Sequence, residues 1–319
     1  MISVIIVNYN RKDLLRQCLD SVRGQSFQDI ETIVVDNAST DGSIEMADMY
    51  YSAVNLIRNT SNLLFCKAQN QGIEASKGNF ILCLNSDCVL DKDYLKQVLS
   101  AIGLDTRIGM VSGKILRMNR KTIDSAGLFL GRNRKPVERG YGKKDKGQYD
   151  EPGYVFGASG ACAFLRKSML KNIRDKYGYF DERFGMYYED LDLCWRAQKK
   201  GWESYYNPKA LAYHMRGGTA VGERRHCEVA KRPKQSQERL LRFAPPFLKK
   251  GRGFARNDRF GYLSDELKKR YIANRYLCMR KNDSLRGILL NLPFIILYEI
   301  KIWGYMLVVK KLLDLRGKK

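Results

Sequence analysis

The sequence predicts an α/β protein with a mostly parallel central sheet and flanking helices. Apolar, β-branched runs alternate with segments of helical periodicity through the first 100 residues, and a small polar cluster follows each run. This alternation is typical of parallel sheets, because parallel neighbours need a crossover connection. The chain has 319 residues, of which 44% are hydrophobic and 29% charged, so it can form a sizeable core in one large or two modest domains.

The elements follow in order along the chain. The expected strands are 2–7, 31–35, 54–57, 79–84 and 110–113. The expected helices are 13–22, a segment of about ten residues after Ser43, 70–76 and 91–102. Region 117–150 is rich in Lys, Arg and Gly and is expected to form a long loop or hairpin. Region 154–166 suits a strand or turn, and 202–206 and 210–214 are expected to be the last strands of this domain.

Positive charge is concentrated in the C-terminal third of the chain. The net charge is +23, and the residues from Arg216 onward contain 26 Lys and Arg against 9 Asp and Glu, compared with 31 and 25 before that point. This part is expected to contain a basic helix at 223–242 and a flexible basic loop at 249–253. Such a segment indicates a polyanionic partner, either nucleic acid or an anionic membrane surface.

Segment 285–313 is the most apolar part of the chain. Its uninterrupted apolar run covers only eleven residues, 288–298, whereas a membrane-spanning helix needs about 20. Trp303 and Tyr298 with flanking basic residues favour a helix that lies in the plane of an anionic membrane surface. The alternative is a pair of C-terminal core helices. We expect no nucleic-acid partner, because the region lacks a recognisable nucleic-acid-binding motif. Strongly salt-sensitive DNA binding would favour a nucleic-acid partner.

Cysteine usage and the N-terminus bear on the compartment. None of the eight cysteines forms a C-x-x-C pair, and several occupy apolar-periodic positions, which indicates buried, reduced thiols. The chain begins directly with a strand-like run and shows no signal-peptide pattern. Together with the basic C-terminal region, this predicts a peripheral protein on the cytoplasmic face of the cell membrane. The oligomeric state is not defined by the sequence.

An acidic cluster at 189–192 opens a helical pattern. Glu189, Asp190 and Asp192 precede apolar residues with helical spacing, so they fall in a first helical turn. Free N–H groups and the helix dipole there favour ionised carboxylates, which would make Asp190 a weak base. An ordinary acidic helix start is the alternative to a catalytic carboxylate.

Two more polar clusters follow expected strands. Asp36 with Asn37 comes after the second strand, and Asn85, Ser86 and Asp87 come after the strand at 79–84. Singly, such residues usually form turns. Because open α/β sheets bind ligands at the carboxyl ends of their strands, three clusters at one edge indicate a binding site.

These clusters lie within motifs that resemble those of family 2 glycosyltransferases. The motifs are VIIVNYN at 4–10, VVDNASTDGS at 34–43, LNSD at 84–87 and YEDLDLCWR at 188–196. GYFDERF at 178–184 and HMRGGT at 214–219 look most like the bacterial rhamnosyltransferase-like branch. The resemblance implies a GT-A fold, Rossmann-like, over residues 1–220. The remainder, 221–319, is expected to be a basic helical extension with a membrane-associating segment at about 285–313.

The resemblance also implies nucleotide and metal ligands. Tyr9 and Asp36 would contact the base, and Asn70 and Ser86 are further candidates for nucleotide binding, although Asn70 could equally cap a helix. Asp87 would bind a divalent metal, Mg²⁺ or Mn²⁺, because oxygen ligands and a diphosphate suit these ions. The metal motif has Asn85 where relatives carry Asp, so either the phosphates supply most of the metal ligands or His214 completes the set. The alternative for His214 is a structural role.

On the acceptor side, the resemblance implies that Asp190 is the general base of an inverting transfer, that Glu189 supports it, and that Asp192 is structural. The donor would be a nucleoside-diphosphate sugar, with rhamnose the first choice and UDP- or GDP-sugars the alternatives. The acceptor would be a lipid-linked or cell-envelope glycan. Asn37, where many relatives carry a second Asp, weakens any two-carboxylate site at that strand. A catalytically idle scaffold of the same family is a further alternative.

Overall fold

The computed structural model of the protein describes residues 1–216 and 264–316. The expected helix at 223–242 and basic loop at 249–253 lie outside the described residues, as does the expected domain boundary near 220.

The first half of the sheet is parallel, as predicted. Its spatial order is β4-β1-β2-β3, and β1 forms parallel ladders with both β2 and β4. These strands are β1 (Ile2–Asn8), β2 (Ile30–Asp36), β3 (Val54–Arg58) and β4 (Phe80–Asn85). The crossover helices are α1 (Lys12–Arg23), α2 (Ser43–Tyr50) and α3 (Leu64–Ala75). β1 is buried along almost its whole length, which explains its continuous apolar, β-branched run.

The second half of the sheet mixes strand directions. β11 (Cys162–Arg166) runs antiparallel to β4 and to β6 (Ile108–Arg117), whereas β12 (Glu203–His214) runs parallel to β6. β10 (Gly153–Val155) forms one edge. The two strands expected at 202–206 and 210–214 are one strand, whose register shifts between Asn207 and Leu211.

The sequence does not predict most of the short strands of this half. β5 (Cys88–Leu90) pairs with β12, and β7 (Ile123–Ser125) pairs with β6. β8 (Leu128–Leu130) and β9 (Pro136–Glu138) form a separate hairpin, one of the two forms expected for region 117–150, which also contains β7. The helices are α4 (Tyr94–Ile102), α5 (Lys167–Ile173) and α6 (Glu189–Lys199).

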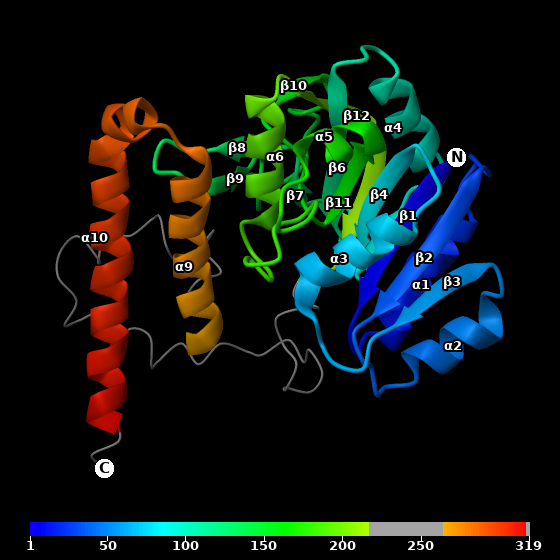
Figure 1. Cartoon of the computed structure of the whole chain (residues 1–319), viewed down its shortest axis with the longest axis horizontal. Helices are drawn as coiled ribbons and strands as arrows, with labels where there is room; N and C mark the ends of the chain where they lie inside the picture. Colours follow the sequence, from blue (N-terminus) through cyan, green and yellow to red (C-terminus); the bar gives the residue numbers. More distant parts are fainter. Residues whose placement is uncertain (217–263, 317–319) are drawn as a thin grey trace.

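Two hydrophobic cores lie on opposite faces of the sheet. One core contains residues of α1, α2 and α4, and the other contains residues of α3, α5 and α6. Figure 1 shows these helices around the sheet, with the C-terminal helices to one side. The seven cysteines of the described ranges are buried free thiols, as expected.

The C-terminal part forms two helices, α9 (Asp265–Asn282) and α10 (Leu285–Arg316), which lie side by side (Figure 1). α9 packs on α6, and its Asn282 side chain donates a hydrogen bond of 2.7 Å to Asp192. In α10, Ile295, Tyr298 and Ile302 are buried, whereas many other apolar side chains are exposed. Among the described residues, no helix combines the length and apolarity needed to cross a membrane.

Candidate active site

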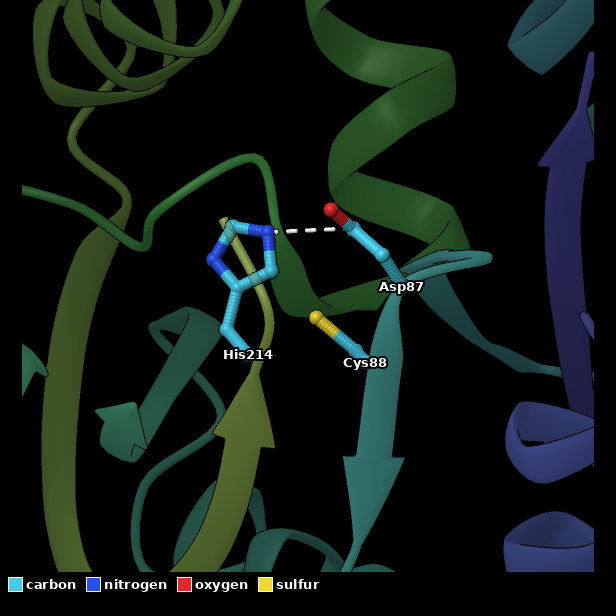
Figure 2. Close-up of side chains that lie close together, drawn as sticks. All are labelled: Asp87, Cys88 and His214. Atoms are coloured by element: carbon cyan, nitrogen blue, oxygen red, sulfur yellow. Dashed lines mark hydrogen bonds and ion pairs between the residues drawn. The ribbon is translucent and has the colours of Figure 1, made fainter. Parts of the chain in front are cut away.

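The pairing of β5 with β12 brings two polar side chains together at the carboxyl end of β4. Asp87 lies in the turn between β4 and β5, and His214 is the last residue of β12, directly opposite Cys88. The Nε2 atom of His214 lies 3.1 Å from the Oδ1 atom of Asp87 (Figure 2). Both side chains are buried. The structure thus brings together two residues that the sequence assigned to one metal site.

A second carboxylate, which the sequence analysis missed, holds the other side of the imidazole. Asp124 in β7 is fully buried, and its Oδ2 atom lies 2.9 Å from Nδ1 of His214. Arg216 approaches Oδ1 of Asp124 to 2.7 Å. In the sequence, Asp124 stands out only as an acidic residue between Ile123 and Ser125 in a region rich in Lys and Arg.

The electrostatics of this cluster follow from burial and ion pairing. Burial alone would lower the pKa of His214, but the hydrogen bonds with Asp124 and Asp87 raise this pKa to about 9. Burial alone would also raise the pKa of Asp124, but His214 and Arg216 lower it. These contacts favour the protonated form of His214 and the ionised form of Asp124.

The donor set fits a hard divalent metal. One ligand atom each of Asp87, Cys88 and His214 lie within 4.8 Å of one another. Cys88 keeps its proton, because burial raises its thiol pKa well above the ordinary value and its Sγ atom donates to the Ala161 carbonyl at 3.3 Å. The carboxylate and the imidazole are thus the suitable donors, a set that Mn²⁺ or Mg²⁺ accepts. A carboxylate on the second ring nitrogen, such as Asp124, is a common partner of metal-binding histidines.

The second part of the site is the start of α6. Its first residues, Glu189 and Asp190, follow Tyr187 and Tyr188, which have left-handed φ angles of 70° and 71°. This conformation costs a bulky residue about 1–3 kcal/mol and is often found at functional sites. The acidic helix start predicted from the sequence is confirmed, and the chain enters this helix through a strained turn.

Asp190 is held by backbone groups. Its Oδ2 atom accepts a hydrogen bond of 3.2 Å from Gly160 N, and its Oδ1 atom accepts one of 2.7 Å from Leu191 N. A Cβ atom on Gly160 would lie 3.3 Å from the Cβ atom of Asp190, so glycine permits this close approach. Region 154–166, which was expected to form a strand or turn, therefore borders Asp190.

The two acidic groups at the helix start have raised pKa values. Burial, assisted by the neighbouring Asp190, raises the pKa of Glu189 to about 8. Burial also raises the pKa of Asp190 and outweighs the backbone N–H groups that oppose it. The expectation that the helix terminus makes Asp190 a weak base is therefore wrong in direction, because desolvation exceeds the effect of the helix end.

A short polar chain connects the two parts of the site. Glu138 in β9 accepts a hydrogen bond of 2.8 Å from Ser159, which precedes Gly160. Arg216 lies 3.8 Å from the same Glu138 oxygen and also pairs with Asp124. Burial raises the pKa of Glu138 to about 7, although Arg216 opposes this shift. The histidine cluster and Asp190 thus line one continuous polar region.

The four residues expected to bind the nucleotide lie at different places. Tyr9 is 42% exposed at the end of β1, and Ser86 is buried beside Asp87. Asp36 is buried and accepts hydrogen bonds from the Asn8 side chain at 2.9 Å and from Ser39 N at 2.7 Å. Their contact with nucleotide stays a prediction.

Asn70 is separate from these three. Its side chain donates to the Phe180 carbonyl and accepts from Phe180 N, both at 2.9 Å. It therefore braces α3 against the loop that precedes α6. Asp192, expected to be structural, is fully buried and pairs with Arg196, one turn later in α6, at 2.8 Å.

Comparison with known proteins identifies transferases with similar sequences and folds. The model of glycosyl transferase family 2 matches residues 3–174. The chain is 30% identical over 226 residues to the amylovoran biosynthesis glycosyltransferase AmsB of Erwinia amylovora, and the match covers 67% of this chain and 69% of that protein. It is 27% identical over 240 residues to the N-acetylglucosaminyl-diphospho-decaprenol L-rhamnosyltransferase of Mycobacterium tuberculosis, with 67% and 76% covered.

Other matches cover less of the relative. The chain spans 31% of a Bacillus subtilis protein and 50% of the poly-beta-1,6-N-acetyl-D-glucosamine synthase of Staphylococcus epidermidis. Among solved structures, the mannosyltransferase PcManGT from Pyrobaculum calidifontis, in complex with GDP-Man and Mn²⁺, superposes with a TM-score of 0.52 at 17% identity. That match covers 98% of this chain and 87% of the other. At 17% identity, this similarity shows a shared fold.

Proposed function

Because the chain belongs to glycosyl transferase family 2 and has its GT-A-like α/β fold, we propose that it is an inverting, metal-dependent glycosyltransferase. It moves a sugar from a nucleoside-diphosphate donor to a lipid-linked or cell-envelope glycan acceptor. The observation that carries the proposal is the polar region in which the buried Asp87–His214 pair and the backbone-held Asp190 carboxyl are joined through Glu138.

Each residue has a defined task in this reaction. Asp87 and His214 would hold Mg²⁺ or Mn²⁺, which offsets the negative charge of the leaving diphosphate. Asp190 accepts the proton of the acceptor hydroxyl, whose oxygen bonds to the anomeric carbon of the donor sugar. The bond between that carbon and the diphosphate oxygen breaks in the same displacement, so the anomeric configuration inverts. The raised pKa of Asp190 suits a general base better than that of an exposed aspartate does.

Thermal unfolding with candidate donors tests this proposal. A ligand at 100 times its Kd stabilises the folded state by about 2.7 kcal/mol. We expect dTDP-rhamnose with Mn²⁺ to raise the Tm most, and the Asp87→Asn variant to lose the part that depends on Mn²⁺. A larger rise in Tm with a UDP- or GDP-sugar would identify that sugar nucleotide, in place of dTDP-rhamnose, as the donor. If none of these nucleotide sugars shifts the Tm with or without metal, the proposal is refuted.

We further propose that the acceptor side faces an anionic membrane surface, to which α10 binds in the plane. The exposed apolar side chains of α10 include Leu289 at 59% and Leu297 at 66% exposure. The chain also carries a net charge of +23. Burying apolar side chains at an interface while basic groups meet anionic headgroups is the usual mode of such helices.

Sedimentation with lipid vesicles tests the membrane proposal. Replacing Leu289 and Leu297 together with Glu should weaken binding to anionic vesicles at least tenfold, because a buried leucine contributes about 1.5–3 kcal/mol. Leu104→Glu is the matched control, since Leu104 is 65% exposed beyond the end of α4. Equal binding by the double variant and the control would refute the role of α10. Equal binding of the wild-type protein to zwitterionic and anionic vesicles would refute the anionic surface as its partner.

A further inference from the structure

The strained turn before α6 is held from outside the catalytic-domain sequence. The carbonyl groups of Phe184, Met186 and Tyr187 all point at the side-chain amide of Asn274 in α9. The Nδ2 atom of Asn274 lies 2.8 Å from the first two oxygens and 2.9 Å from the third. An amide NH₂ group has two hydrogens, so three carbonyls share two donors. Asn274 is 4% exposed, so these hydrogen bonds are buried.

Aromatic packing supports the same turn. The Tyr271 ring, one helical turn before Asn274, meets the rings of Tyr188 and Tyr187 edge to face, with centroid separations of 5.0 and 6.1 Å. These are the two residues with left-handed φ angles. Bulky residues keep such angles only where the surrounding structure determines them, and α9 provides that structure here.

The C-terminal end of α9 is itself fixed by ion pairs and hydrogen bonds. Lys281 Nζ lies 2.7 Å from Asp181 and 3.2 Å from Asp192, and Asn282 donates to Asp192 at 2.7 Å. These contacts anchor the C-terminal end of α9 on α6 and on the loop before it. A helix anchored two turns away can therefore impose a fixed position on the turn at 184–188.

We propose that Asn274 is a positioning residue for the Glu189–Asp190 pair, and that α9 belongs functionally to the active site. The inference rests on the proposed role of Asp190. Asn274 acts through the backbone of the strained turn, which sets where α6 begins and where the Asp190 carboxyl points. It makes no contact with the reacting atoms, so its loss should affect turnover and leave donor binding intact.

The test compares two alanine variants in the full chain. Asn274→Ala removes the amide that binds the turn, and Gln25→Ala removes another buried side-chain amide, 2% exposed, which donates to the carbonyls of Ser21 in α1 and Asp91 before α4. Hydrogen exchange is measured for the amides of 184–192, and kcat and donor KM are measured with the donor that the thermal panel selects. Asn274→Ala should speed exchange in 184–192 and lower kcat by about ten- to a hundredfold, the scale expected for a misplaced catalytic group, with KM changed less than threefold.

Gln25→Ala should lower the Tm without these two effects. If Asn274→Ala does not fold, Tyr271→Leu gives the same readouts, since Tyr271 is only partly buried. Unchanged exchange in 184–192, or an equal loss of kcat in Gln25→Ala, would overturn the inference. If the wild-type protein turns over no donor, the proposed function fails, whereas the exchange measurement still decides whether Asn274 holds the turn.

Discussion

Replacing Asp124 with Asn tests whether the buried carboxylate behind His214 serves the metal site. The substitution keeps the shape of the side chain and removes its charge. Asp124 is fully buried and contacts both Nδ1 of His214 and Arg216, so the substitution weakens two interactions that depend on its negative charge. In the wild type, this carboxylate orients the imidazole so that Nε2 faces Asp87.

The expected magnitude follows from the two kinds of hydrogen bond. A hydrogen bond to a charged group contributes about 1.5–3 kcal/mol, and a neutral one about 0.5–1.5 kcal/mol. The difference, on the order of 1.4 kcal/mol, corresponds to a tenfold change in an equilibrium constant. We therefore expect Asp124→Asn to weaken Mn²⁺ binding about tenfold, within the range found for partners of metal-binding histidines.

The assay is a titration with Mn²⁺, in the presence of the selected nucleoside diphosphate, that follows free Mn²⁺ by electron paramagnetic resonance. Asp181→Asn is the matched control, because Asp181 is also a fully buried carboxylate but pairs with Arg183 and Lys281. The control should lose stability and keep its metal affinity. An Mn²⁺ affinity of Asp124→Asn within twofold of the wild type would refute the reasoning.

Three further predictions concern catalysis, acid stability and packing. Asp190→Asn should lower kcat by about 10²–10⁴, the usual contribution of a general base, in a single-turnover assay at saturating donor; a loss below tenfold would contradict that role. Burial would raise the pKa of Asp181, but Arg183 and Lys281 lower it from 3.8 to about 2, so its stabilisation is present above pH 4 and is lost as the pH falls towards 2. Lys281→Met should therefore reduce stability at neutral pH and flatten this acid-induced loss in urea titrations. Gly72→Ala should cost about 1–3 kcal/mol in the same titrations, because its Cβ atom would lie 2.3 Å from a side-chain carbon of Ile5.

The local elements of the first half were predictable because their signals are local. Strands β1 and β2 are β-branched runs and β4 is an apolar run, and each of the three ends in a polar cluster that the structure places at one edge of the sheet. The acidic start of α6 was likewise readable from the spacing of Leu191, Cys194 and Trp195. Hydrophobic periodicity reports which face of an element is buried, and this information lies within about ten residues.

The missed features depend on contacts between distant segments. β5 has only three residues and is defined by its partner β12, so no periodicity could reveal it. Asp124 lay in a basic region without periodicity, and Asn274 lay in a helix whose apolar face is weak. The pKa of Asp190 went in the direction opposite to expectation, because burial in the folded protein exceeded the effect of the helix end.

The sequence by itself determined the α/β class, the order of the motifs and the chemical groups placed at the strand ends. Only the tertiary structure decided which of those groups meet. Asp87 and His214 are separated by 127 positions, and His214 and Asp124 by 90. Asn274 and the turn that it holds are separated by 87 to 90 positions. Contacts over such separations arise from strand pairing and helix docking, which no local pattern of residues encodes.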